Sequence, residues 1–323
     1  MTGVDLAGLA RVRAEHPEAV AEAAARRVRR PLVLPGRGLL VVAADHPARG
    51  VLGAGPDPFA MASRRELLDR LCLALAHPGV DGVLGSADVL DDLLLLGALD
   101  GKVVIGSMNR GGLAGSVFEA DDRFTGPRPA DLVRSRYDAG KILLRIDPAD
   151  PGTLRTLHTA ARTVDEMARA RLPVFLEPFL SRREGGVLRN DLGAGAVTRS
   201  IAVASGLAGT SAYTWLKVPV TEDPADMERV METSALPAVL LGGESAATPA
   251  EQERAYDRWR RALRLPTVRG LVVGRALLYP ADGNVAGAVD TAAGLLASAF
   301  GGVGASQGPL GARDVLGRQK GPG

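Results

Sequence analysis

Lysine is scarce in this chain, and its few lysines are the residues best suited to covalent chemistry. Among 39 basic Lys and Arg residues only four are lysine: Lys102, Lys141, Lys217 and Lys320. Arginine stays protonated and is a poor nucleophile, whereas a buried lysine can lose its proton and attack a carbonyl group. A lysine retained inside an apolar segment is therefore a candidate nucleophile.

Lys217 meets this description best, because it lies inside the apolar run Trp215–Val220, where burial lowers the pKa of an amine. Lys141 begins the run that continues to Ile146, so from the residues alone it could equally lie at the surface. If the two lysines face each other, their ammonium groups depress each other's pKa and favour a nucleophilic amine. Lys102 follows Asp100-Gly101 and is expected to lie in solvent.

Other polar residues also interrupt or end the apolar runs. Glu177 ends the run Val174–Leu176, where it could form a structural ion pair or shuttle protons. Gly-Gly and Gly-Arg pairs follow the last two runs, where backbone N–H groups and a guanidinium could hold a phosphate. The candidate substrate and phosphate ligands are Gly242, Gly243, Gly274, Arg275, Arg145 and His46, and Asp45 ends the first run.

The elements that must position these residues alternate regularly. Eight apolar runs, each followed by a segment of helical period, predict a single (β/α)8 TIM barrel with an extra N-terminal helix. A doubly wound open sheet is the alternative, although no Gly-x-Gly-x-x-Gly follows the first run. The predicted strands are 39–44, 82–85, 103–106, 142–146, 174–176, 215–220, 238–241 and 271–273, and the predicted helices are 63–76, 88–99, 130–139, 151–171, 190–205, 225–233, 249–263 and 285–299.

The same pattern divides the chain into three parts. Residues 1–34 are expected to form a helical extension, 35–300 the catalytic barrel and 301–323 a disordered Gly-rich tail. Two polar segments, 107–126 and 181–190, follow predicted strands and are expected to be loops that cover the substrate at the barrel mouth.

Composition excludes several classes of function. Hydrophobic residues make up 46% of the chain and charged residues 24%, with a net charge of +2 and no long basic run, so nucleic acid is not an expected partner. No apolar stretch is long enough to cross a membrane and no signal peptide is recognisable, which predicts a cytoplasmic protein without a membrane partner. Cys72 is expected to be a buried core thiol, and the arginines at 26, 27, 29 and 30 a solvated helix end.

The remaining residues argue against two further mechanisms. The four histidines are scattered without ligand-like spacing, so no metal is expected. No Gly-x-Ser-x-Gly elbow occurs, so Ser/His/Asp hydrolysis is not expected either.

Taken together, the motifs resemble class I (Schiff-base) aldolases of the deoxyribose-phosphate, tagatose-bisphosphate and fructose-bisphosphate aldolase superfamily. The resemblance covers roughly residues 35–300 and lies in Ala43–Pro47, Gly140–Leu144, Phe175–Pro178, Trp215–Val218 and Val273–Ala276. It implies an enzyme that needs no cofactor, acts on a phosphorylated sugar and assembles as a homo-oligomer.

The resemblance also implies roles for individual residues. Lys217 would form the Schiff base, Lys141 would tune protonation and Glu177 would shuttle protons. Asp45 would lie near the substrate hydroxyls. The phosphate would be held by Gly243, Gly274 and Arg275.

A finer resemblance concerns the substrate. Asp45-His46-Pro47, Asn109–Gly112 and Asp121–Gly126 are similar to an actinobacterial deoxyribose-phosphate-aldolase-like branch associated with inositol catabolism. This implies cleavage of 2-deoxy-5-keto-gluconate 6-phosphate to dihydroxyacetone phosphate and malonate semialdehyde. Tagatose-bisphosphate aldolases carry Asp-Gln-Arg where this chain has Asp45-His46-Pro47, with Arg49 displaced, so contacts at the non-ketose end can differ.

Two alternatives stay open at this point. One is a phosphosugar isomerase or epimerase that uses Glu177 as its base without a covalent intermediate. The other is a barrel without catalytic activity that binds a sugar phosphate.

Overall fold

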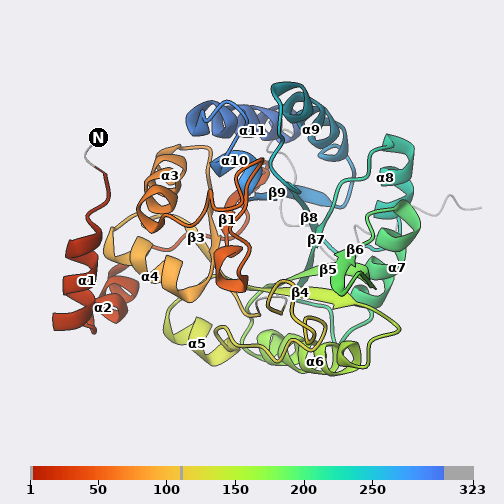
Figure 1. Ribbon diagram of the computed structural model, residues 1–323, viewed down its shortest axis with the longest axis horizontal. Coiled ribbons are helices and arrows are strands. Elements are labelled where there is room, and N and C mark those ends of the chain that lie inside the picture. Colours follow the sequence, from red (N-terminus) through yellow and green to blue (C-terminus); the bar gives the residue numbers. More distant parts are fainter. Residues whose placement is uncertain (1–2, 110–111, 302–323) are drawn as a thin grey trace, which may run out of the picture.

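Parallel pairing closes the sheet into a barrel. The computed structural model describes residues 3–109 and 112–301. Its parallel strands follow the order β4-β3-β2-β1-β9-β8-β7-β5, and pairing of β4 with β5 completes the ring (Figure 1). The open-sheet alternative is therefore wrong. The barrel strands are β1 (Leu39–Ala44), β2 (Gly82–Gly85), β3 (Val103–Ser107), β4 (Ala139–Ile146), β5 (Val174–Glu184), β7 (Thr214–Val218), β8 (Ala238–Leu241) and β9 (Val268–Val273).

Helices surround the barrel and cover its outer face (Figure 1). Several begin at a side chain that accepts a hydrogen bond from the first turn, as Ser63, Asp223 and Thr248 do, and Thr248 forms a capping box with Glu251. The outer helices are α3 (Arg64–Ala76), α4 (Ala87–Leu95), α5 (Pro129–Arg134), α6 (Gly152–Arg169), α7 (Ala194–Ser205), α8 (Pro224–Met231), α9 (Pro249–Ala262) and α11 (Val285–Phe300), and a short helix α10 (Arg275–Leu278) follows β9.

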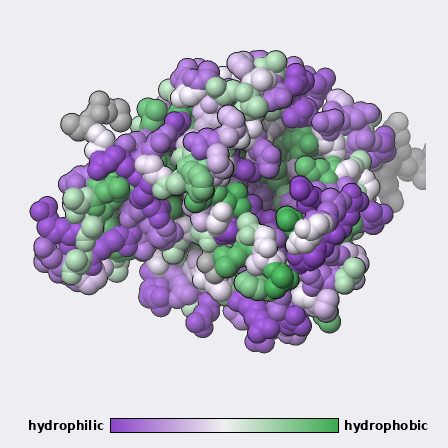
Figure 2. Space-filling model, viewed as in Figure 1, coloured by the Kyte–Doolittle hydropathy of each residue, from purple (hydrophilic) through white to green (hydrophobic). Residues whose placement is uncertain are grey.

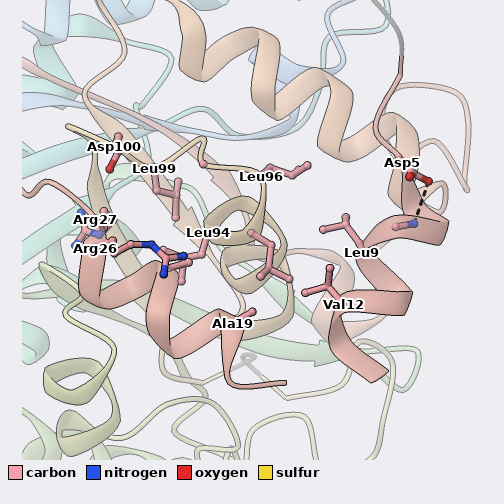
Figure 3. Close-up of a pocket in the computed structure, with 14 residues that line it drawn as sticks. Asp5, Leu9, Val12, Ala19, Arg26, Arg27, Leu94, Leu96, Leu99 and Asp100 are labelled. Atoms are coloured by element: carbon pink, nitrogen blue, oxygen red, sulfur yellow. Dashed lines mark hydrogen bonds between the residues drawn. The ribbon is translucent and has the colours of Figure 1, made fainter. Parts of the chain in front are cut away.

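The N-terminal extension contains two helices rather than the one predicted. These are α1 (Leu6–Glu15) and α2 (Ala19–Arg26), which lie outside the ring against α4 (Figure 1). A groove of about 550 Å³ runs between them and α4, lined by apolar side chains such as Leu9 with charged residues at its ends (Figure 3).

The prediction of a solvated helix end holds for Arg26, which ends α2 with a side chain that is 70% exposed, but it is wrong for the arginines that follow. The Arg27 side chain is only 1% exposed, and its Nη2 lies 3.1 Å from Asp138 Oδ2, while Arg29 Nε lies 2.7 Å from Asp138 Oδ1. Arg30 Nη1 lies 2.5 Å from Asp81 Oδ1. Because these two aspartates directly precede β4 and β2, the ion pairs fasten the extension to the N-terminal end of the barrel.

Segment 181–190 follows the barrel part of β5, as predicted, but it is a hairpin and not a loop. Strand β5 continues to Glu184 and pairs antiparallel with β6 (Val187–Asn190), which makes a hairpin that projects beyond the barrel. The described part of 107–126 lies between β3 and α5 without regular structure, and Arg110 and Gly111 lie outside the described residues. The predicted tail likewise lies outside them from residue 302 onward.

Two smaller predictions, on the exposure of Cys72 and of Lys102, are wrong. Cys72 is only half-buried, because it lies at the edge of the apolar face of α3. Lys102 is half-buried too, since its Nζ donates a hydrogen bond of 2.7 Å to the carbonyl oxygen of Val80. Neither residue lies near the mouth of the barrel.

The apolar core has two parts, separated by the strands. Outward-facing residues such as Leu40 and Val42 pack against the helices, whereas inward-facing residues such as Leu39 and Val41 fill the barrel. Side chains alternate between the two faces of a strand. Within the described residues, no helix is long and apolar enough to span a membrane.

Candidate active site

The alternation of side chains along the strands places four ionisable groups inside the barrel. Each stands two residues beyond an inward-facing apolar residue of its strand: Ala43, Ala139, Phe175 or Trp215. The four are Asp45, Lys141, Glu177 and Lys217, all less than 10% exposed. Lys141 is therefore buried inside the barrel and does not lie at the surface. The strand β4 begins two residues before it, at Ala139.

Glu177 connects the two lysines. Lys217 Nζ donates a hydrogen bond of 2.7 Å to Glu177 Oε1, and Lys141 Nζ lies 2.6 Å from the other carboxylate oxygen. Lys141 Nζ also donates a hydrogen bond of 3.0 Å to Asp45 Oδ2. Amines and carboxylates thus alternate from β7 through β5 and β4 to the end of β1.

The two amines differ in their pKa. Burial lowers the pKa of Lys217, and the charge of Lys141 adds to this effect, while Glu177 opposes it. Burial also disfavours the charge on Lys141, but the carboxylates of Asp45 and Glu177 outweigh it and raise the pKa of that amine. The expected depression therefore holds for Lys217 alone, which is the amine that more readily loses its proton.

The two carboxylates stay ionised. Burial would raise the pKa of Glu177, but Lys141 and Lys217 hold it at about 2. Burial would raise the pKa of Asp45 too, but the charge of Lys141 outweighs burial and lowers that pKa. Each carboxylate can thus accept a proton during a reaction and return it to a neighbouring amine.

Ser107 and Asn109 support this cluster. Ser107 Oγ donates a hydrogen bond of 3.0 Å to Asp45 Oδ2. Asn109 Nδ2 donates to the carbonyl oxygen of Leu143, and Leu143 N donates to Asn109 Oδ1, each at 2.7 Å. Sequence reasoning missed Ser107, although counting by two from Val103 along β3 would have identified an inward position.

His46 follows Asp45 in the chain and packs next to Gly274, which follows β9. Its Nδ1 is 3.9 Å from Asp45 Oδ1, too far for a hydrogen bond. Burial lowers the pKa of His46 to about 3 against the attraction of Asp45, with Arg275 adding to the decrease, so the imidazole is neutral. A Cβ atom on Gly274 would lie 3.0 Å from His46 Cε1.

Geometry explains the glycines after β8 and β9. A Cβ atom on Gly242 would lie 2.3 Å from Val273 Cγ1, and one on Gly274 would lie 2.6 Å from the carbonyl oxygen of Ala43. Gly243 has a φ of +70°, which favours glycine. Arg275 begins α10. Its Nη1 donates only a long hydrogen bond of 3.5 Å to the carbonyl oxygen of Gly53, and its Nε is buried without a partner among the described residues, so the guanidinium can still bind an anion.

Arg145 lies apart from this group. It is on β4, which stands four strands from β9 in either direction around the ring, and its Nη1 hydrogen-bonds to the buried carboxylate of Glu119. Glu119 follows no strand or helix directly, so the sequence carried no local signal for it. Among residues 3–109 and 112–301, no group of His, Cys, Asp and Glu side chains could hold a metal ion.

The loops that follow the strands form the face seen in Figures 1 and 2. In the space-filling view this face is hollowed near its centre, over the strands, with hydrophilic residues around the recess (Figure 2).

Comparison with known proteins identifies the family. Residues 37–293 match the family described as Cgl0159-like. The chain belongs to this family. A crystal structure of Cgl0159 from Corynebacterium glutamicum shares 51% identity with it, over 90% of this chain and 96% of that one, with a TM-score of 0.86. No curated protein matches the chain.

More distant structures share the fold of this Cgl0159-like protein. A Schiff-base-forming fructose-1,6-bisphosphate aldolase is 18% identical over 86% of this chain and 99% of its own, with a TM-score of 0.60. A fructose-bisphosphate aldolase from Slackia heliotrinireducens is 15% identical over 93% of this chain and 90% of its own, with a TM-score of 0.61. The barrel is therefore the one found in class I aldolases.

Proposed function

We propose that this protein is a class I aldolase that cleaves a phosphorylated keto sugar or keto sugar acid through a Schiff base on Lys217. The supporting observation is a buried amine of lowered pKa at 2.7 Å from a carboxylate that also contacts a second lysine. Such an arrangement supplies both a nucleophile and a route for the protons that it must gain and lose.

The reaction begins with attack of Lys217 Nζ on the substrate carbonyl carbon. Protons pass through Glu177 to the carbonyl oxygen, which leaves as water, and a protonated imine remains on Lys217. This positive nitrogen accepts the electron pair of the adjacent carbon–carbon bond when that bond breaks. An aldehyde leaves after its hydroxyl proton is removed, and the enamine on Lys217 is then protonated and hydrolysed to release the second product.

The neighbouring residues have complementary roles. Lys141, whose pKa is raised, keeps a positive charge beside Glu177 and can replace the proton that Glu177 gives up. Asp45 accepts hydrogen bonds from Lys141 and Ser107, and it lies at the barrel mouth where substrate hydroxyls would approach.

The substrate that we propose is 2-deoxy-5-keto-gluconate 6-phosphate, with dihydroxyacetone phosphate and malonate semialdehyde as products. Its phosphate would bind where β8 and β9 end, at Gly242, Gly243 and Gly274, beside Arg275. The neutral His46, which packs next to Gly274, would contact the same end of the substrate. The Nε of Arg275, which is buried without a partner among the described residues, and the close backbone approach at the glycines support this assignment.

Reduction with borohydride tests the covalent step. The protein is incubated with dihydroxyacetone phosphate, reduced and digested, and the peptides are analysed by mass spectrometry. The expected result is a reduced adduct on Lys217 in the wild type and none in Lys217→Arg. Lys102→Arg serves as a matched control, since it also removes a lysine, here a half-buried one bonded to the Val80 carbonyl oxygen, but should keep the adduct.

The other outcomes contradict the proposal. Turnover of phosphosugars without any adduct would favour an isomerase or epimerase. Binding of phosphorylated ketoses with neither adduct nor turnover would favour a barrel without catalytic activity.

A further inference from the structure

Arg145 is a buried cation that the covalent mechanism does not use. Its side chain is 10% exposed and projects inward from β4, two residues beyond Leu143 on the face that carries Lys141. Burial and the charge of Arg49 lower the pKa of Arg145 to about 10, so it remains a cation at neutral pH. Its Nε is buried and has no hydrogen-bond partner among the described residues.

Glu119 holds this cation in place. Its Oε1 accepts a hydrogen bond from Arg145 Nη1, and its Oε2 accepts one of 3.2 Å from Gly115 N. The segment that carries Glu119 is itself fastened, because Asp122 Oδ2 accepts a hydrogen bond of 2.8 Å from Gly112 N. Glu119 thus accepts a hydrogen bond from one nitrogen of the Arg145 guanidinium. The other N–H groups of the guanidinium remain available to another acceptor.

Arg49 lies against the same segment. Its carbonyl oxygen accepts a hydrogen bond of 3.0 Å from Ala114 N, and it follows Asp45 and His46 in a short 3-10 turn. Its charge acts on both Arg145 and Arg275. Since Arg49 makes no ion pair within the described part of the chain, the approach of these cations is unfavourable until an anion joins them.

The barrel separates Arg145 from the proposed phosphate position. Strand β4 stands opposite β9 across the ring, and Glu177 on β5 and Lys217 on β7 belong to the wall between them (Figure 1). A substrate with its phosphate beside Arg275 and its carbonyl at Lys217 therefore extends towards β4. Its far end would meet Arg145.

We infer that the β4 side of the mouth is a second anion subsite, in which Arg145, positioned by Glu119 and assisted by Arg49, binds an anionic group at the end of the substrate remote from its phosphate. This inference rests on the proposed function for the orientation of the substrate. It assigns the substrate to a class, an open-chain sugar derivative with anionic groups at both ends. Either a carboxylate or a second phosphate fits the guanidinium fork.

Binding of hexitol derivatives tests the subsite without any reaction. Sorbitol 6-phosphate carries one anionic end, 6-phosphogluconate adds a carboxylate at the other end, and a hexitol 1,6-bisphosphate adds a phosphate. None of the three has a ketone that Lys217 could attack in the open chain. Calorimetry should show that the wild type binds one of the doubly anionic compounds at least about tenfold more tightly than sorbitol 6-phosphate, since a hydrogen bond to a charged group contributes that much.

Variants show which residues cause the preference for doubly anionic compounds. Arg49→Gln should reduce the preference, and the double variant Arg145→Gln, Glu119→Gln should remove it while sorbitol 6-phosphate binds as before. The double variant leaves no buried unpaired charge, which protects folding. Arg275→Gln is the matched control at the proposed phosphate position. It should weaken the binding of all three compounds by a similar factor.

The result also identifies the anion. Preference for 6-phosphogluconate indicates a carboxylate site, and preference for the bisphosphate indicates a phosphate site. Equal affinity of the wild type for all three compounds would overturn the inference, as would a preference that survives in the double variant. The borohydride adduct with dihydroxyacetone phosphate does not involve Arg145, so failure of this subsite and failure of the aldolase proposal give different results.

Discussion

Replacing Glu177 by glutamine tests whether one carboxylate serves both lysines. The amide has nearly the same shape but no negative charge, so one of its ends must turn an N–H donor towards an ammonium group. In the wild type each carboxylate oxygen contacts a lysine, Lys217 at 2.7 Å and Lys141 at 2.6 Å. The substitution therefore removes one favourable contact and weakens the other.

The expected loss of folding stability follows from the shifted pKa of Glu177. Although burial alone would raise its pKa, Lys141 and Lys217 lower it from 4.5 to about 2. This shift corresponds to about 3 kcal/mol of stability. Because the pKa is depressed in the folded protein, the contribution is complete above pH 4.5 and is lost as the pH falls through 2. At pH 3 about half of it remains.

Urea denaturation at pH 7 and pH 3 measures this effect. Glu177→Gln should lower the free energy of unfolding by about 3 kcal/mol at pH 7 and by about half as much at pH 3. At pH 7 kcat should fall by about 10² to 10⁴, the usual contribution of a general acid or base. Glu184→Gln is a matched control, since Glu184 ends the same strand but is exposed.

Two results would refute this reasoning. A variant that keeps kcat within tenfold of the wild type shows that Glu177 moves no essential proton. A loss of stability that is equal at the two pH values shows that the carboxylate is not held ionised by the lysines.

Three further predictions concern single residues. Lys217→Arg should abolish cleavage while keeping the charge, measured as triose-phosphate release in a coupled assay, and activity within tenfold of the wild type would contradict the Schiff-base assignment. Arg275→Ala should raise KM for phosphorylated substrates with a smaller change in kcat, and an unchanged KM would remove its phosphate role. Asp138→Asn should lower the free energy of unfolding by about 3 kcal/mol, because the buried Arg27 loses its charged partner, and thermal denaturation would detect this.

Much of the barrel could be predicted from local sequence. Continuous apolar runs such as 39–44 and 238–241 mark strands that are buried on both faces, and the structure has strands at these positions. The start of β4 was misplaced because Ala139 and Gly140 are weak strand formers. They are extended here because they pair with Ile105 and Gly106 of β3.

The site could be predicted only in part. Lys217 and Glu177 stood out because polar residues are rare in apolar runs. The contacts of Glu119 and of Arg27 could not be predicted, since their partners are 26 and 111 residues away in the chain. The polar sequence of residues 181–190 is typical of a loop, but main-chain pairing between β5 and β6 makes it a hairpin.

The ion pairs at the N-terminal end of the barrel have a consequence for biosynthesis. Arg27 emerges from the ribosome 111 residues before Asp138, an interval on the order of ten seconds. During that interval the Arg27 guanidinium, which is buried in the folded protein, lacks the Asp138 carboxylate that pairs with it. Arg30 can pair with Asp81 earlier, but docking of the leading segment is complete only after the first half of the ring has been translated.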